Sequence, residues 1–392
     1  MELKSSVEGN VITVVLPERI DTLNASEAEA AINAALDANS GYREVVLDAS
    51  ALTYISSVGL RVILRLKKSH DDLKIVEVAS EPYEVFEMTG FTEMISVTKK
   101  MREVSIAGCP MIGEGYYGRV YRISPDTIVK HYYRGSPISE IDRERKLAKS
   151  AFVSGVPTAI AYDVVRVKEG GFGAVYELIE AKSLKSLILG DLDHMDKYLD
   201  LYAGLLKKIG STEADESLPR CAELAKKWLD AVKKVISPSL YEAINKLVDT
   251  IADENVLVHG DCHFKNIFVL PDGEPILIDM DSIERGARIY EYASLYIAYI
   301  AYELDDPGNS LRFMGAPDEV LRKIYRGILR RIFADRNDGE FELIMKKIEF
   351  LGNVHFLEKA LRDEDGDEFG RIPHTIERIE KAIDGLQDLK LF

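Results

Sequence analysis

The chain has 392 residues, a formal net charge of −16 and 46% hydrophobic residues. This length predicts two or three domains, and the apolar content is enough for packed cores. Because an acidic chain does not attract nucleic acid or an anionic membrane surface, we expect neither as a partner.

The cysteines point to a reducing compartment. Cys109, Cys221 and Cys262 are scattered along the chain and odd in number, and they form no CxxC pair. This usage predicts a cytoplasmic protein without a zinc site or a disulfide framework. The longest apolar stretch, near residues 294–302, is too short to span a bilayer.

Residues 1–100 read as a separate α/β domain with a mixed sheet and helices. Its sequence patterns predict strands at 11–16, 44–48 and 73–78 and helices at 24–36, 58–68 and 82–88. The stretches Leu47–Leu64 and Val85–Phe91 resemble the STAS domain of bacterial anti-sigma factor antagonists.

The STAS resemblance implies a protein partner and a phosphorylated serine. Ser57 occupies the phosphoacceptor position before the second helix, although the Asp that usually precedes it is Ser56 here. A phosphate at this helix N-terminus would be stabilised by free N–H groups and the helix dipole, by about 0.3–1 kcal/mol. The alternative is that Ser56 or Ser57 serves only as an N-cap.

A short charged connector, residues 101–108, precedes a glycine-rich hairpin. Gly113, Gly115, Gly118 and Val120 fit the pattern GxGxxGxV, in which missing side chains let the backbone approach phosphate oxygens. A second strand follows and ends at Lys130.

A helical stretch after that strand carries Glu144, fourteen residues beyond Lys130. Glu144 is the expected ion-pair partner of Lys130, and Glu140, one turn earlier, is the alternative. A glycine loop alone is weak evidence for nucleotide binding.

The most specific segment runs from His259 to Asn266 and on to Asp279. Asp261 is followed by Asn266 after five residues and by Asp279 after eighteen. Phosphoryl transfer needs a carboxylate that orients the attacking hydroxyl and takes its proton, and oxygen ligands that hold Mg²⁺ against the phosphates of ATP. Asp261 fits the first role, and Asn266 and Asp279 fit the second.

These motifs together resemble the protein kinase-like fold. The spelling His-Gly-Asp is similar to that of the aminoglycoside phosphotransferase and choline kinase group. The resemblance implies an α+β two-lobed domain, with a small lobe at 109–182 and a large helical lobe at 183–392. It also implies that backbone groups of Glu177, Leu178 and Ile179, between the lobes, bond the adenine ring.

Other residues near the motif keep two readings. Asp281 and His263 are candidate contacts to the metal, the substrate or the phosphates, with structural roles as the alternative. His259 is expected to brace the loop. Tyrosines 292, 296 and 299 recur at helical spacing and are expected in the core.

The acceptor is expected to be a hydroxyl group on a small molecule. Asp279-Met280-Asp281 replaces the Asp-Phe-Gly of protein kinases, and no peptide-docking segment follows it. The acidic cluster at 363–368 either favours a cationic substrate or is a solvated loop. Two other functions stay open: a regulatory protein kinase that phosphorylates a STAS serine such as Ser57, and a non-catalytic nucleotide sensor.

Overall fold

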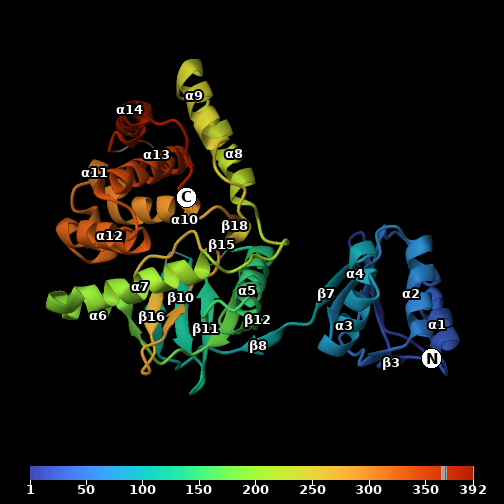
Figure 1. The fold of residues 1–392 in the computed structure, drawn as a ribbon. Helices are drawn as coiled ribbons and strands as arrows, with labels where there is room; N and C mark the ends of the chain where they lie inside the picture. The colour runs from blue at the N-terminus through green and yellow to red at the C-terminus, as the bar shows by residue number, and fades with distance from the viewer. Residues whose placement is uncertain (116, 134, 363–366, 368, 392) are drawn as a thin grey trace. The chain divides into compact units, whose positions relative to one another are not determined.

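The computed structural model describes residues 1–392 except 116, 134, 363–366, 368 and 392, and it divides into two compact units (Figure 1). The first unit is Met1–Val104 and the second is Ser105–Phe392. The boundary lies inside the predicted connector 101–108. Most of the predicted acidic cluster, residues 363–366 and 368, lies outside the described residues.

The first unit is a mixed sheet with helices. Its strands follow the order β1-β2-β4-β6-β7, in which β1 and β2 are antiparallel and the later pairs are parallel. The central strands are β-branched and alternate buried with half-buried residues, so one row of side chains packs under the helices. Its elements are β1 (Ser5–Glu8), β2 (Val11–Val15), β3 (Arg19–Ile20), α1 (Ala25–Asp37), β4 (Glu44–Asp48), β5 (Tyr54–Ile55), α2 (Ser57–Ser69), β6 (Lys74–Val78), α3 (Ser80–Met88), α4 (Phe91–Met94), β7 (Ser96–Lys99) and β8 (Arg102–Val104).

Helix α2 begins as a serine-capped helix. The Ser56 side chain accepts a hydrogen bond from the Gly59 amide at 3.4 Å, so Ser56 is the N-cap and Ser57 is the first helical residue. Gly59 lies against the β3–β5 pair, where a Cβ would come within 2.5 Å of the Ile20 carbonyl oxygen. The close approach of helix and strands therefore requires glycine at position 59.

The small lobe of the second unit is an antiparallel sheet beside one long helix. Neighbouring strands run in the order β12-β13-β11-β10-β9, and α5 packs on β12 and β13 (Figure 1). Its elements are β9 (Met111–Glu114), β10 (Gly118–Arg122), β11 (Thr127–Tyr132), α5 (Ile138–Val153), β12 (Ala161–Val167) and β13 (Phe172–Glu177).

The predicted connector is not a free tether at its C-terminal end. Glu169, in the turn between β12 and β13, accepts hydrogen bonds from the backbone amides of Ile106 (3.0 Å) and Ala107 (2.9 Å) and from the Ser105 hydroxyl. These donors lower the pKa of Glu169 to about 2, the Ser105 hydroxyl having the largest effect. The Glu169 carboxylate therefore ties the last residues of the predicted connector to the small lobe.

The large lobe is helical apart from short hairpins. Helix α13 packs against α8, α10 and α14, and α12 packs against α7. Its elements are β14 (Lys182–Ser183), α6 (Leu184–Gly190), η1 (Leu192–His194), α7 (Met195–Ile209), α8 (Cys221–Val232), α9 (Pro238–Val248), β15 (Val256–Val258), β16 (Ile267–Val269), β17 (Pro275–Leu277), β18 (Glu284–Gly286), α10 (Ile289–Tyr296), η2 (Ile297–Ala301), α11 (Tyr302–Asp305), η3 (Ser310–Met314), α12 (Asp318–Ile332), α13 (Asp338–Arg362) and α14 (Arg371–Ile383).

A continuous helical stretch from α10 through η2 to α11 forms the centre of the large-lobe core. The middle segment, η2, is a π-helix, and Tyr292, Tyr296 and Tyr299 are all buried, as their spacing predicted. In the part of the chain that the structure describes, no helix is both long and apolar enough to cross a membrane.

Two glycines give opposite predictions for stability. Gly59→Ala should destabilise the first unit by about 1–3 kcal/mol, because the new methyl group would collide with the Ile20 carbonyl oxygen and the Ile55 side chain. Gly204→Ala should stabilise the second unit by up to about 1 kcal/mol, because Gly204 is exposed inside α7 and its Cβ would meet open space. Thermal unfolding of both variants measures whether each substitution lowers or raises stability. Unchanged stability of Gly59→Ala would contradict the packing described for α2.

Candidate active site

The glycine hairpin is built by β9 and β10. Gly113 and Gly118 lie in these strands, and Gly115 lies in the turn, where a Cβ would meet open space. A Cβ at Gly118 would instead collide with the backbone carbonyl of His131 on β11. The close pairing of β10 with β11 therefore also requires glycine at position 118. Val120 pairs with Lys130 across these strands.

Lys130 is held by Glu144 from helix α5. Lys130 Nζ lies 2.7 Å from Glu144 Oε1, and the two side chains are only 17% and 9% exposed. Glu140, the alternative partner, is exposed. Tyr132 Oη donates to Glu144 Oε2 at 2.7 Å and Tyr176 Oη donates to Glu144 Oε1 at 3.3 Å, so three donors fix this carboxylate.

Lys130 also reaches the large lobe. Its Nζ lies 3.1 Å from Asp279 Oδ1. Burial lowers the pKa of Lys130, but the charges of Asp279 and Glu144 outweigh this and raise the pKa overall. The amine is therefore cationic at any physiological pH and lies between carboxylates from both lobes.

The loop from His259 to Asn266 follows strand β15 and carries the predicted acid–base group. Asn266 Nδ2 donates to Asp261 Oδ2 at 3.1 Å and to the Asp261 backbone carbonyl at 3.0 Å. The Asp261 side chain is 43% exposed, and His263 Nε2 lies 3.6 Å from Asp261 Oδ2. The structure thus brings Asp261, His263 and Asn266 together with a carboxylate oxygen open to solvent.

Asp279 joins this loop through the β16–β17 hairpin. The Ile278 amide donates to the Asn266 carbonyl at 3.0 Å, immediately beyond the pair Ile267–Leu277. The buried ring of His259 lies within reach of the charges of Asp261, Asp279 and His263, and burial lowers its pKa. The His259 Nδ1 accepts the Asp261 amide at 3.3 Å, which fits the expected bracing role.

The oxygen atoms of Asn266 and Asp279 fit a magnesium ion. The Asn266 amide nitrogen is used by Asp261, which leaves its Oδ1 as a free acceptor, and Asp279 supplies a carboxylate. In the described ranges, no group of three or more His, Cys, Asp or Glu side chains could hold a metal. Two protein ligands suit Mg²⁺, which fills its other positions with water and substrate phosphates.

Asp281 differs electrostatically from Asp279. Burial raises the pKa of Asp281 to about 6, and the nearby charge of Asp279 adds to the effect. The Ser282 hydroxyl donates to Asp281 Oδ1 at 2.8 Å, and Arg143 from α5 donates to its backbone carbonyl at 3.5 Å. Asp281 therefore lies in the site with one oxygen already hydrogen-bonded.

Two backbone amides in the segment predicted to contact adenine are hydrogen-bonded within the protein. The Glu177 amide donates to the Ile160 carbonyl at 3.0 Å, and the Leu178 amide donates to the Asp126 carbonyl at 2.8 Å. These two N–H groups are therefore already paired within the protein. The Ile179 amide forms no hydrogen bond with the described residues, so it is the remaining donor of the three.

Glu291 on α10 supports the loop and was not predicted. Its carboxylate accepts the backbone amides of His259 at 2.5 Å and Gly260 at 3.2 Å. Burial raises the pKa of Glu291 to about 7, although the two amides oppose the rise. A single acidic residue in an otherwise apolar helix was the available signal, since a buried carboxylate requires donors.

Ser57 of the first unit is accessible for modification. The residue is exposed at the first position of α2, and its hydroxyl makes no hydrogen bond with the described part of the chain. Ser56 provides the cap, so Ser57 has no capping role. The capping role therefore belongs to Ser56, and phosphoacceptor stays the role predicted for Ser57.

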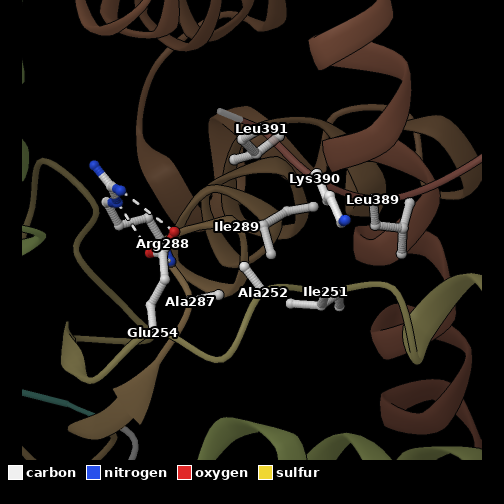
Figure 2. A pocket seen from close by; sticks show the side chains of 9 residues that line it. All are labelled: Ile251, Ala252, Glu254, Ala287, Arg288, Ile289, Leu389, Lys390 and Leu391. Carbon is white, nitrogen blue, oxygen red and sulfur yellow. Dashed lines mark hydrogen bonds and ion pairs between the residues drawn. The ribbon is translucent and has the colours of Figure 1, made fainter.

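Two hollows lie away from these residues. Figure 2 shows the smaller, with a volume of about 10 Å³, lined by residues such as Ile251, Ile289 and Leu391 and by the Glu254–Arg288 ion pair. A neighbouring hollow of about 490 Å³ is lined by residues of α8 and β18, including Arg285, and by Arg220 just before α8. Among the described residues, none predicted for the site lines either hollow.

Comparison with known families identifies both parts of the chain. The family model of the phosphotransferase enzyme family matches residues 109–310, more than half of the chain. The chain belongs to that family. The STAS domain model matches residues 3–104, so this phosphotransferase carries a STAS domain at its N-terminus. Both resemblances and the two-part fold class inferred from the sequence are confirmed.

Individual known proteins are also similar to parts of this chain. An anti-sigma factor antagonist, BtrV of Bordetella bronchiseptica, is 34% identical over 111 residues, which cover 27% of the phosphotransferase chain and 93% of BtrV. Aminoglycoside phosphotransferase APH(4)-Ia is 13% identical, with a TM-score of 0.48 over 70% of this chain and 92% of that one. Choline kinase LicA from Streptococcus pneumoniae is 15% identical, with a TM-score of 0.44 over 77% and 100%.

The buried Glu291 predicts a pH dependence of stability. Its pKa is about 7 in the folded phosphotransferase and about 4.5 when unfolded, so the unfolded chain loses this proton first as pH rises. The free energy of unfolding should therefore fall between pH 4.5 and 7, by on the order of 3 kcal/mol, and level off above.

Glu291→Gln removes this titration and should flatten that part of the curve, as measured by urea unfolding from pH 5 to pH 8. The control is Glu319→Gln, an exposed glutamate on α12, whose curve should parallel the wild type. Parallel curves for Glu291→Gln and wild type would contradict the raised pKa.

Proposed function

We propose that the chain is an ATP- and Mg²⁺-dependent phosphotransferase that moves the γ-phosphoryl group to a hydroxyl of a small molecule. The observation that carries the proposal is the position of Lys130, whose amine contacts Glu144 in the small lobe and Asp279 in the large lobe. A cation fixed between the lobes, beside a carboxylate suited to a metal, is what the phosphates of a nucleotide require.

The reaction assigns one role to each group. Asp261 accepts a hydrogen bond from the acceptor hydroxyl and takes its proton on a carboxylate oxygen. The acceptor oxygen forms a bond to the γ-phosphorus while the bond from that phosphorus to the β–γ bridging oxygen breaks, and ADP leaves with the electron pair. Asn266 and Asp279 would hold Mg²⁺, which neutralises charge on the phosphates when bound.

The small lobe would position the nucleotide. Lys130 binds the α- and β-phosphates under the hairpin that carries Gly113, Gly115 and Gly118. The Ile179 amide and the backbone carbonyls of Glu177 to Ile179 are the groups we assign to the adenine edge, since the other two amides are occupied.

A small acceptor is supported by the short path that follows the metal-binding residue. Strand β18 begins at Glu284 and helix α10 begins at Ile289, only ten residues after Asp279. This leaves no room for an extended segment that could dock a peptide.

The STAS domain would bind a protein partner, and the three unpaired cysteines fit a cytoplasmic location.

Two substitutions separate the proposed roles of the carboxylates. Asp261→Ala should lower kcat by about 10²–10⁴-fold with nucleotide affinity largely kept, because only proton acceptance is lost. Asp279→Asn should instead abolish Mg²⁺-dependent nucleotide binding. ADP release and calorimetric titration with ATP and Mg²⁺ measure the two effects. Normal turnover of Asp261→Ala, or an unchanged titration of Asp279→Asn, would remove the assigned role.

Exposed Ser57 favours a second candidate, a regulatory protein kinase that phosphorylates its own STAS serine. Incubation of the full chain with labelled ATP, followed by peptide mass spectrometry, discriminates the two. Phosphate on Ser57 that disappears in Asp261→Ala supports the kinase candidate. We expect no self-labelling under the small-molecule proposal, and Ser57→Ala is the matched control for the site.

A further inference from the structure

Two tyrosines from different helices contact the backbone of the loop that carries Asp261. Tyr202 on α7 donates from its hydroxyl to the Cys262 carbonyl. The Phe264 amide donates to Tyr299 Oη on η2 at 2.8 Å. The two hydroxyl oxygens are 3.2 Å apart. A chain of hydrogen bonds therefore links the backbone at residue 264 to the backbone at residue 262.

The direction of every bond in this chain is determined. An amide only donates and a carbonyl only accepts, so the Phe264 proton points to Tyr299 and the Tyr202 proton points to Cys262. The bond between the hydroxyls must then use the proton of Tyr299. Each hydroxyl donates once and accepts once, so loss of either hydroxyl breaks the same circuit.

Water does not replace these groups where they lie. Tyr202, Cys262 and Phe264 have no exposed surface, and Tyr299 is 1% exposed. Burial raises the pKa of both tyrosines, so both stay protonated and keep their donor role across the physiological range. Removal of the Tyr299 hydroxyl would leave a buried amide without an acceptor, which is more costly than the loss of an exposed bond.

The π-helix explains how Tyr299 reaches the loop. Segment η2 interrupts the α-helical path between α10 and α11, and Tyr299 lies in its middle. A π-helical turn contains an extra residue and changes the direction in which its side chains leave the axis; such turns recur at functional sites. The Tyr299 ring also packs edge-on against Phe264, with centroids 5.7 Å apart.

We propose that Tyr202 and Tyr299 act as one unit that positions the catalytic loop from its buried side. The circuit spans the residue His263, whose ring lies 3.6 Å from the Asp261 carboxylate. Neither tyrosine touches a reacting atom, so both are positioning residues. This inference rests on the proposed function, since the loop it holds is the one assigned to proton acceptance.

The test uses Tyr202→Phe, Tyr299→Phe and the double variant in the full chain, with ATP–Mg²⁺ as the probe and water as the acceptor. Each single variant should lower the rate of ADP release roughly tenfold, since small displacements of a catalytic group are costly. The KM for ATP should stay within about twofold, and the double variant should be no slower than about half the rate of a single variant.

A matched control is Tyr325→Phe. Tyr325 is also buried, but its hydroxyl has no hydrogen-bond partner among the described residues, so its loss should change neither rate nor protection. Because Tyr202 and Tyr299 lie on separate helices, a folding defect in one variant still leaves the other as an independent test of the same circuit.

Hydrogen exchange provides a readout that does not depend on activity. Exchange of the Phe264 amide should accelerate at least tenfold in both single variants, while the β16–β17 hairpin amides keep their protection. Unchanged Phe264 exchange, unchanged rates, or single effects that multiply in the double variant would each overturn the proposal. Faster exchange without any ADP release by the wild type would instead refute the proposed function and leave the loop contact standing.

Discussion

The contact of Lys130 with two carboxylates is the constraint on which the site depends. The Lys130 side chain is only 17% exposed, so its ammonium group needs opposite charges close by, and Glu144 and Asp279 provide them from different parts of the fold. Lys130 can make both contacts only if β11, α5 and the segment after β17 keep their positions relative to one another. Tyr132 and Tyr176 remove the freedom that Glu144 would otherwise have.

The loop after β15 depends on a second set of buried polar contacts. Glu291 holds the amides at its beginning, and the tyrosine circuit holds the middle. Buried polar groups are costly when unpaired and specific when fully paired. Placing them beneath the loop leaves the Asp261 carboxylate as a solvent-accessible group on an otherwise fixed backbone.

From the sequence, we could name the candidate site residues that lie within short motifs. Phosphoryl transfer sets the spacing of such groups, so short motifs contain His259 to Asn266, the glycine hairpin and Lys130. Glu291, Tyr132 and Tyr176 were not predicted, because helical periodicity shows that a residue is buried but not which backbone group it faces. The backbone contacts of Gly118 and of the Glu177 and Leu178 amides could not be predicted for the same reason: their partners are on strands and loops distant in sequence.

The fold was read with similar limits. Long amphipathic helices such as α2 and the β-branched strands β2, β4 and β6 were found, because their periodicity is strong. The edge strands β1 and β7 were missed, since most of their residues are exposed and neither carries a continuous apolar pattern.

The backbone of Asp279 has φ of 64°, in the left-handed region that most side chains avoid. Only glycine, asparagine and aspartate occupy it at low cost. The residue proposed to bind the metal is thus restricted twice, by the ion and by the turn beneath it. A descendant of this chain that lost phosphoryl transfer but kept its fold would be expected to have asparagine or glycine at this position. An alanine there would indicate that the backbone conformation of the turn had also changed.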